Sequence, residues 1–158
     1  MTVKTHRFGI TNLKKIHLYI FQRIYPFAGK FRMENIHKDS TEFCKSQYIE
    51  ENLKAIFHGL KQEEFLKSLN VEPFSQKAVY YLSELNKIHP FREGNGRTIR
   101  EFIRQLAMHS GYIINFFRRG FTPLVFRFYG LLHCHLTISI IYLFQLIYVV
   151  VQYRISKY

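Results

Sequence analysis

The chain has 158 residues, 47% of them hydrophobic, and a formal net charge of +12, which is the size and composition of one globular domain with its own core. All 11 acidic residues lie within positions 1–101, so the net charge reflects missing acids near the C-terminus rather than a concentrated basic patch. No nucleic-acid-binding motif accompanies the charge, and DNA or RNA binding is therefore not expected.

The N-terminal segment and the two cysteines indicate an intracellular setting. The first 25 residues contain no long apolar run with a small-residue cleavage site, so no signal peptide is predicted. Cys44 and Cys134 lie far apart and fit no zinc or disulfide spacing. Both are expected to be ordinary reduced cysteines of a cytosolic protein.

The first third of the chain predicts a helix and then a hairpin. Apolar residues at helical spacing predict a helix over Thr11–Tyr25, capped by Thr11 or Asn12 and closed by Pro26. Phe27–Phe43 combines partial alternation with several turn-forming residues, which predicts a short β-hairpin.

Further helical segments follow, separated by turn-forming residues. Ser46 is expected to cap a helix whose apolar residues recur every three or four positions, and a short helix is predicted over Gln62–Leu69. Pro73 opens a helix that ends near Ile88. After a glycine-rich interruption, helical spacing resumes over Arg97–Met108, and a glycine is expected to stop that helix.

The last part of the chain has a different composition. Residues 102–158 contain no aspartate or glutamate, and Phe128–Val151 contains no acidic residue, lysine or arginine. This segment is long enough to cross a bilayer, although its polar residues lower its hydropathy. Three interpretations of this segment stay open. It is a membrane span, which is not favoured, a buried or partner-facing apolar segment, or an out-of-frame end of the gene. We therefore divide the chain into a core, 1–115, and an atypical apolar tail, 116–158.

The most informative segment, HPFREGNGRTIREF, begins at His89. Its two glycines, Gly94 and Gly96, precede a predicted helix, where the backbone can turn its N–H groups toward an anion. Arg97 and Arg100 are three residues apart on that helix and can flank the same anion. The pattern predicts a phosphate cradle, which we define as residues 93–100.

The same segment contains groups that suit phosphate chemistry. Glu93 is the carboxylate inside the cradle and is the expected Mg²⁺ ligand. His89 is the nearby group suited to general-base work at neutral pH. Phe91 is expected to anchor the loop in the core, and Glu101 to be a surface residue or the partner of a nearby base. Together these residues predict attack by a hydroxyl group on a phosphate of a Mg-nucleotide.

Residues 89–100, HPFREGNGRTIR, match in full the motif HPFx[DE]GNGRxxR of the Fic family, which the chain resembles. Ile16–Arg32 is similar to the first helix of that family and the start of its hairpin, so the resemblance covers about residues 10–114. It implies an all-α helical bundle with a small β-hairpin flap. The implied activity is that of a protein adenylyltransferase, which transfers AMP from Mg-ATP to a hydroxyl side chain of a target protein.

The resemblance also implies a role for each residue of the loop. His89 would deprotonate the target hydroxyl, and Glu93 would hold Mg²⁺ against the α- and β-phosphates. Gly94, Asn95 and Gly96 would form the anion hole. Gly96 favours nucleotidyl transfer, because the branch of the family that transfers phosphate has a lysine at that position.

The remaining implied contacts involve the arginines and the hairpin. Arg97 and Arg100 would bind the phosphates, with Arg100 reaching the outermost ones. The hairpin, at about 30–44, would be the flap that binds the target backbone by strand addition. Lys38 and Asp39 at its tip are expected contacts to nucleotide or target.

One regulatory element of the family has no clear counterpart here. Many members carry an inhibitory helix, [ST]xxxE[GN], and no glutamate follows Glu101 to supply a C-terminal copy, while Ser46–Glu50 matches only its first five positions. The resemblance therefore implies a toxin or effector that a separate antitoxin inhibits or that has no restraint. It would act in the bacterial cytoplasm or after secretion into a host cell. The alternative is a catalytically degenerate remnant or binding module whose tail prevents activity.

Overall fold

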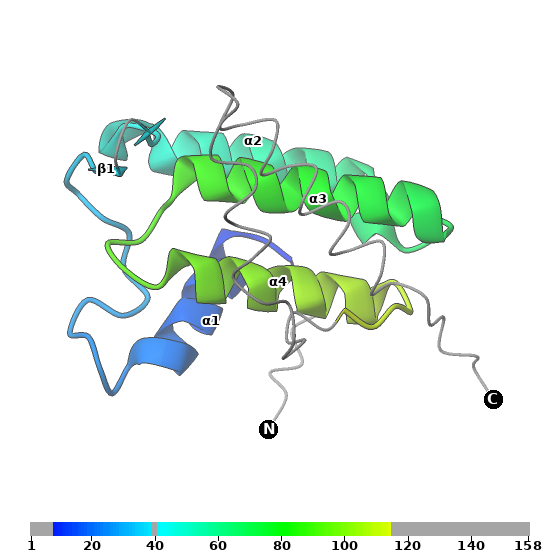
Figure 1. The fold of residues 1–158 in the computed structure, drawn as a ribbon, viewed down its shortest axis with the longest axis horizontal. Helices are drawn as coiled ribbons and strands as arrows, with labels where there is room; N and C mark the ends of the chain where they lie inside the picture. The colour runs from blue at the N-terminus through cyan, green and yellow to red at the C-terminus, as the bar shows by residue number, and fades with distance from the viewer. Residues whose placement is uncertain (1–7, 39–40, 115–158) are drawn as a thin grey trace, which may run out of the picture.

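The computed structural model of the protein describes residues 8–38 and 41–114, and helices dominate this part of the chain. Its α-helices are α1 (Ile10–Phe21), α2 (Ile49–Gln62), α3 (Val71–Ile88) and α4 (Asn95–His109). α2 and α3 lie side by side, and α4 packs against both α1 and α3 (Figure 1). The all-α class predicted from the sequence is confirmed.

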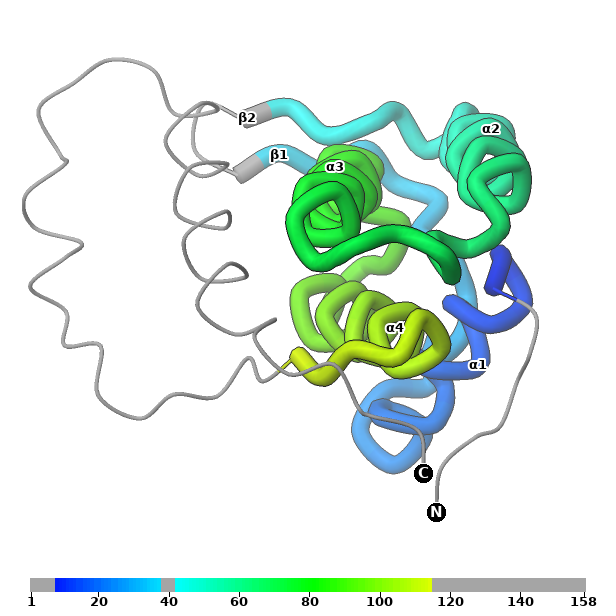
Figure 2. Tube along the Cα trace, turned by 90° about the vertical axis from the view of Figure 1, so that its right-hand side faces the viewer, coloured from blue at the N-terminus to red at the C-terminus, as the bar shows by residue number. Residues whose placement is uncertain are grey.

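Bulky side chains from all of these helices fill one core. In the end-on view of Figure 2, α3 lies over α4, with α2 and α1 along the same side of this pair. Burying one large apolar side chain stabilises the fold by about 1.5–3 kcal/mol. The largest fully buried side chains are those of Phe21, Phe74, Phe91, Phe102, Leu13, Ile49, Leu53, Leu60, Leu66, Leu85, Ile99 and Ile103.

A short hairpin lies between α1 and α2. β1 (His37–Lys38) pairs with β2 (Thr41–Glu42) in antiparallel register. Asp39, which the sequence placed at the tip, lies outside the described residues. After β2, the N–H of Cys44 donates to the C=O of Lys87 at 3.2 Å. The chain on this side of the hairpin is thereby joined to the end of α3.

The predicted helix caps are wrong. α1 begins at Ile10, after Gly9, so neither Thr11 nor Asn12 caps it. Ser46 begins a 3₁₀ turn, η1 (Ser46–Tyr48), and α2 follows that turn. The reason lies in the hairpin region, because the N–H of Ser46 donates to Oδ1 of Asn35 at 2.8 Å. The boundary of α2 is thus set by a tertiary hydrogen bond.

The predicted helix over Gln62–Leu69 is also wrong. η2 (Glu64–Leu66) is a three-residue turn whose φ angles are 50°, 55° and 61°. A residue with a Cβ in this left-handed region costs about 1–2 kcal/mol. The connection between α2 and α3 is therefore strained.

Glu64→Gly is expected to raise the free energy of unfolding by about 1 kcal/mol, because glycine adopts a positive φ without the Cβ penalty. The Glu64 side chain is exposed, so its removal costs no packing. The matched control is Ala55→Gly, at an exposed position of α2, which should lower stability by about 1 kcal/mol. Urea denaturation measures both. A loss of stability at both positions would contradict the strain at Glu64.

None of the helices in the described ranges is long and apolar enough to cross a membrane. Phe128–Val151, for which a membrane span was one of three open interpretations, lies outside the described residues.

Candidate active site

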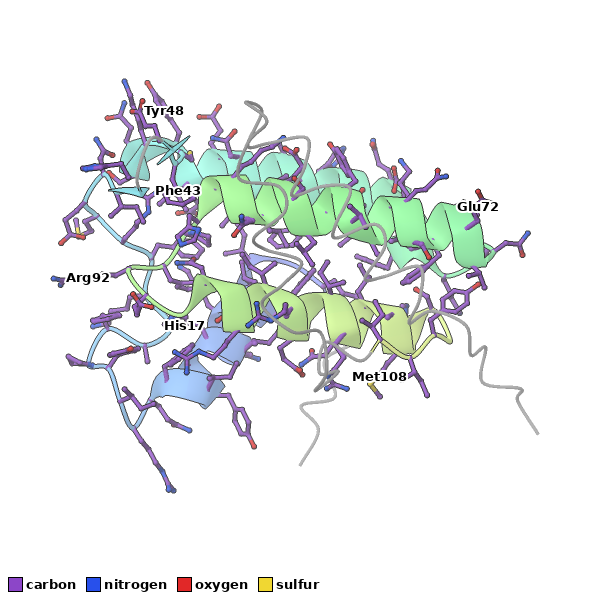
Figure 3. The ribbon with its side chains drawn as sticks, viewed as in Figure 1. His17, Phe43, Tyr48, Glu72, Arg92 and Met108 are labelled. Carbon is purple, nitrogen blue, oxygen red and sulfur yellow. The ribbon has the colours of Figure 1, made fainter. Side chains whose placement is uncertain are left out.

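The residues of the motif lie at one end of the bundle, in the loop that joins α3 to α4 and in the first turns of α4 (Figure 1). β1 lies at the same end. The labelled side chains of Phe43, Arg92 and His17 also lie there, whereas Glu72, near the start of α3, lies at the opposite end (Figure 3). The C-terminal end of α3, the N-terminal end of α4 and the hairpin region thus meet around this loop.

His89 caps the C-terminus of α3 with a left-handed backbone, φ 49° and ψ 62°. For a residue with a Cβ this conformation is uncommon and costs about 1–3 kcal/mol, so neighbouring groups must hold it. The imidazole stacks on Phe43, with ring centroids 4.0 Å apart. Nδ1 lies 3.3 Å from the C=O of Asn86, which can only accept. In this hydrogen bond Nδ1 carries the proton, and Nε2 carries the lone pair that a general base needs.

Asn95 closes the loop with its side chain. Its Oδ1 accepts the N–H of Phe91 at 2.8 Å, and its Nδ2 donates to the C=O of the same residue at 2.6 Å. Both residues are buried, Phe91 completely, so the prediction that Phe91 anchors the loop is confirmed. With its amide used in this way, the group that Asn95 can offer to an anion is its backbone N–H.

Gly94 occupies a position that requires glycine. Its φ is 80°, and a Cβ there would overlap with Cε2 and Cζ of Phe21 in α1. Its C=O accepts the N–H of Thr98 at 3.1 Å and the hydroxyl of Thr98 at 3.0 Å, which begins α4. The N–H groups of residues 95–97 precede the first intrahelical hydrogen bond. They lie at the positive end of α4, where an anion is favoured.

The two motif arginines, Arg97 and Arg100, follow this N-terminus in the first turns of α4, and both are exposed. The guanidinium of Arg97 lies 4.4 Å from the ring centroid of Phe21, so Phe21 supports Arg97 and also packs against Gly94. A Cβ at position 96 would lie 3.3 Å from Nη1 of Arg100. A side chain at position 96 would therefore require the exposed guanidinium of Arg100, which the prediction assigns to the outermost phosphates, to shift by a few tenths of an ångström.

His17, on α1, is fully buried and hydrogen-bonds to the backbone of the loop. Its Nδ1 accepts the N–H of Gly29 at 2.8 Å, so Nε2 carries the proton and donates to the C=O of Glu93 at 2.9 Å. The ring stacks on Phe91, with centroids 3.9 Å apart and planes 16° apart. The backbone of the predicted Mg²⁺ ligand is thus fixed by a neutral imidazole, while the Glu93 side chain is exposed.

The stability of the fold is expected to fall in acid because of His17. Burial lowers the pKa of His17 below its ordinary value of 6.5, against the raising effect of its hydrogen bond to Glu93. The unfolded chain then binds the proton more readily than the folded chain. The stability that His17 contributes is present above pH 6.5 and is lost as the pH falls through the lowered pKa of the folded state.

This prediction is checked by urea denaturation of the wild type and His17→Gln at about pH 7.5 and about pH 5. Glutamine does not titrate, and its amide can still donate to the loop. The wild type should lose more free energy of unfolding between the two pH values than the variant does. Equal losses would contradict the role of His17.

The remaining predicted residues lie outside the loop. Lys38 belongs to β1 and Asp39 lies outside the described residues, so their predicted contacts to nucleotide or target stay predictions. Glu101 pairs with Arg104, with 2.7 Å between Oε2 and Nε, as expected for the partner of a nearby base. Burial acts to raise the pKa of Glu101, but hydrogen bonds from Arg104 and Gln105 lower it overall.

Sequence reasoning assigned no role to His17 or Phe21. Both lie on the buried side of α1 with Leu13, at intervals of four residues. A histidine at a core position is itself a signal, since a buried imidazole needs hydrogen-bond partners. Its partner Glu93 lies 76 positions away, and no spacing in the sequence points to it.

The fold and the loop define a helical domain with a histidine close to a helix N-terminus whose unpaired N–H groups favour an anion. Residues 7–107 match the model of the Fic/DOC family. The chain belongs to the Fic/DOC family, which confirms the resemblance. It is 46% identical over 112 residues to the protein adenylyltransferase VbhT of Bartonella schoenbuchensis, an alignment that covers 71% of this chain and 23% of VbhT. The chain therefore spans less than a quarter of the length of this relative.

Solved structures share the fold. The type IV secretion system effector protein BepA superposes with a TM-score of 0.70 at 29% identity, over 73% of this chain and 44% of that chain. BepC, a VirB-translocated effector of Bartonella tribocorum with bound AMPPNP, superposes with a TM-score of 0.74 at 23% identity, over 92% of this chain and 75% of that chain. The predicted Fic-type helical fold is confirmed.

Proposed function

We propose that the chain is a protein adenylyltransferase that transfers AMP from ATP to a hydroxyl side chain of a target protein. The observation that carries this proposal is the loop between α3 and α4. Within it, His89 lies a few residues from the positive end of α4, Glu93 lies between them, and Arg97 and Arg100 follow. The 46% identity to VbhT, an adenylyltransferase by name, supports the same reaction.

The reaction needs one proton transfer and one displacement. Nε2 of His89 takes the proton of the target hydroxyl, and the oxygen attacks the α-phosphorus of ATP. The bond from that phosphorus to the oxygen bridging to the β-phosphate breaks, and diphosphate leaves. The N–H groups of residues 95–97 and the two arginines hold the charge that develops on the phosphates.

The donor set of the loop fits Mg²⁺. No three metal-ligating side chains cluster among residues 8–38 and 41–114, and Mg²⁺ bound to a nucleotide needs only one or two protein carboxylates. Glu93 is the carboxylate of the loop, and His17 fixes its backbone. Glu93 would hold Mg²⁺, which when bound neutralises charge on the α- and β-phosphates.

The proposal also covers how the enzyme binds its target, how it is regulated and where it acts. The hairpin acts as the flap that binds the target backbone by strand addition, with Lys38 and Asp39 as contacts to target or nucleotide. The enzyme is a toxin or effector, either inhibited by a separate antitoxin or unrestrained. It acts in the bacterial cytoplasm or after transfer into a host cell, which the similarity to the secreted effector BepA supports.

The test is to incubate the purified chain with a bacterial or host lysate and labelled ATP. Label from α-labelled ATP is expected to appear on a protein or on the enzyme itself, and to require Mg²⁺. Transfer of label from γ-labelled ATP would indicate phosphate transfer instead of AMP transfer. It would contradict the role given to Gly96. A folded chain that binds Mg-ATP and transfers neither label would favour the alternative, a degenerate member of the family.

A further inference from the structure

Arg32, between α1 and β1, is a buried arginine that hydrogen-bonds to backbone C=O groups from distant parts of the chain. It is only 4% exposed. Its Nε donates to the C=O of His89 at 2.8 Å, and Nη1 donates to that of Glu34 at 2.7 Å. Its Nη2 donates to the C=O of Ile88 at 3.1 Å and to that of Cys44.

These acceptors belong to two structural elements. Glu34 and Cys44 flank the hairpin, before β1 and after β2, while the other two acceptors end α3. The last C=O groups of a helix lack intrahelical partners and favour a nearby cation. The backbone N–H of Arg32 also donates to the C=O of Pro90 at 3.0 Å. One residue thus joins the base of the hairpin to the start of the loop.

Stability alone is a poor reason for a guanidinium at this position. No carboxylate of the described residues forms a salt bridge with Arg32, and burying an unpaired charge is costly. An apolar side chain of similar volume would avoid that cost. It could not fix several C=O groups at once, which the planar, multi-donor guanidinium does.

The residue whose backbone conformation Arg32 holds is His89. Its backbone has a φ of 49°, which is uncommon for a residue with a Cβ, although histidine adopts it more readily than most. Two groups from the hairpin side hold it there, because Arg32 binds its C=O and Phe43, just after β2, stacks on its ring. A small rotation of this backbone would turn the imidazole away from an incoming hydroxyl.

We propose that Arg32 is a positioning residue for His89. The guanidinium of Arg32 holds His89 in the left-handed backbone conformation that aims its imidazole, and it links this conformation to the hairpin. The inference rests on the proposed function for its chemistry. The orientation of the His89 ring can be measured without turnover. The positioning role of Arg32 and the proposed function can therefore fail separately.

The test compares variants of Arg32 with a matched arginine. Arg32→Lys keeps the charge, but one ammonium cannot reach all four C=O groups, and Arg32→Met removes every donor. The control is Arg104→Lys, because Arg104 is half-buried and its guanidinium donates to Glu101 and Met108 of its own helix. Melting curves establish that each variant is folded.

Steady-state kinetics should separate positioning from binding. A displacement of about 1 Å at a catalytic group costs about 100-fold in rate, so kcat for AMP transfer is expected to fall by about 100-fold in Arg32→Lys. KM for Mg-ATP should stay within about twofold, because the phosphate cradle keeps its residues. Arg104→Lys should keep the wild-type kcat.

The NMR signal of the His89 ring gives a readout that is independent of turnover. Stacking on Phe43 shifts the ring protons of His89 through the aromatic ring current. In both Arg32 variants this signal should move toward the position of an unstacked histidine, and in Arg104→Lys it should stay. A wild type that transfers no AMP, with a signal that responds to Arg32, would support positioning and contradict the proposed function.

A folded Arg32→Lys with the wild-type kcat, or with an unmoved His89 signal, would overturn the inference. Where Arg32→Met gives no cooperative melt, Arg32→Lys decides the outcome. Loss of the melt in both variants would also overturn it, since Arg32 would then hold the whole fold rather than His89.

Discussion

Replacing His89 by alanine is expected to lower the rate of AMP transfer by about 10²–10⁴-fold, the usual contribution of a general base. Mg-ATP binding should remain, because the groups assigned to the phosphates are the N–H groups that begin α4 together with Arg97 and Arg100. Transfer is measured with α-labelled ATP and binding by calorimetry. A loss of binding equal to the loss of rate would place His89 in nucleotide binding instead.

A second substitution separates the chemistry of His89 from its backbone strain. Asparagine tolerates a left-handed backbone that alanine resists, so His89→Asn should keep the loop and still lack the base. Both variants are expected to be equally inactive. His58→Ala, at an exposed position of α2, should keep the wild-type rate. Activity in His89→Asn alone would assign the loss in alanine to loop geometry.

Gly94→Ala is expected to destabilise the fold by about 3 kcal/mol and to abolish Mg-ATP binding. The cost has two parts, a φ of 80° and the overlap of the new Cβ with the ring of Phe21. Phe21 has no exposed surface and cannot withdraw into solvent. The loop must therefore move away from α1, and the first turn of α4 moves with it.

Gly111→Ala is the matched control for this substitution. Gly111 has a φ of 84°, but a Cβ there would meet nothing within 4 Å. Its expected cost is about 1 kcal/mol, the penalty of the backbone alone. The difference between the two variants in urea denaturation measures the contact of Gly94 with Phe21. Equal losses in the two variants would contradict that contact.

The sequence predicted the major helices because each buries a periodic apolar stripe, but it predicted their ends less well. α1 ends at Phe21 rather than at Tyr25. α3 begins at Val71, two residues before Pro73. The N–H that proline lacks is one of those left unpaired in the first turn of a helix. A proline therefore marks the first turn of a helix rather than its first residue.

The motif predicted the loop but not the groups that hold it. His89, Glu93 and the glycines are close together in sequence, so their spacing alone predicts a shared site. The contacts of His17 and Arg32 with the loop span 76 and 57 positions. No periodicity links residues so far apart.

Two other features show the same limit. An asparagine between two glycines suggests a contact to a ligand, yet the amide of Asn95 is used by Phe91. The left-handed turn η2 contains no glycine, and its composition gives no sign of a positive φ. One tertiary contact that holds it is the hydroxyl of Ser110, which donates to the C=O of Phe65 at 3.2 Å.

The long separations of the His17 and Arg32 contacts also decide when a newly made chain acquires its site. Helices form from neighbouring residues, whereas contacts across many positions must first overcome the entropy of closing a long loop. A chain that has left the ribosome only as far as the end of α3 contains neither His89 nor residues 93–100. After α4 is complete, the loop takes its shape only once the region around α1 has docked against it. The geometry of the motif loop then exists only in the completed fold and not during synthesis.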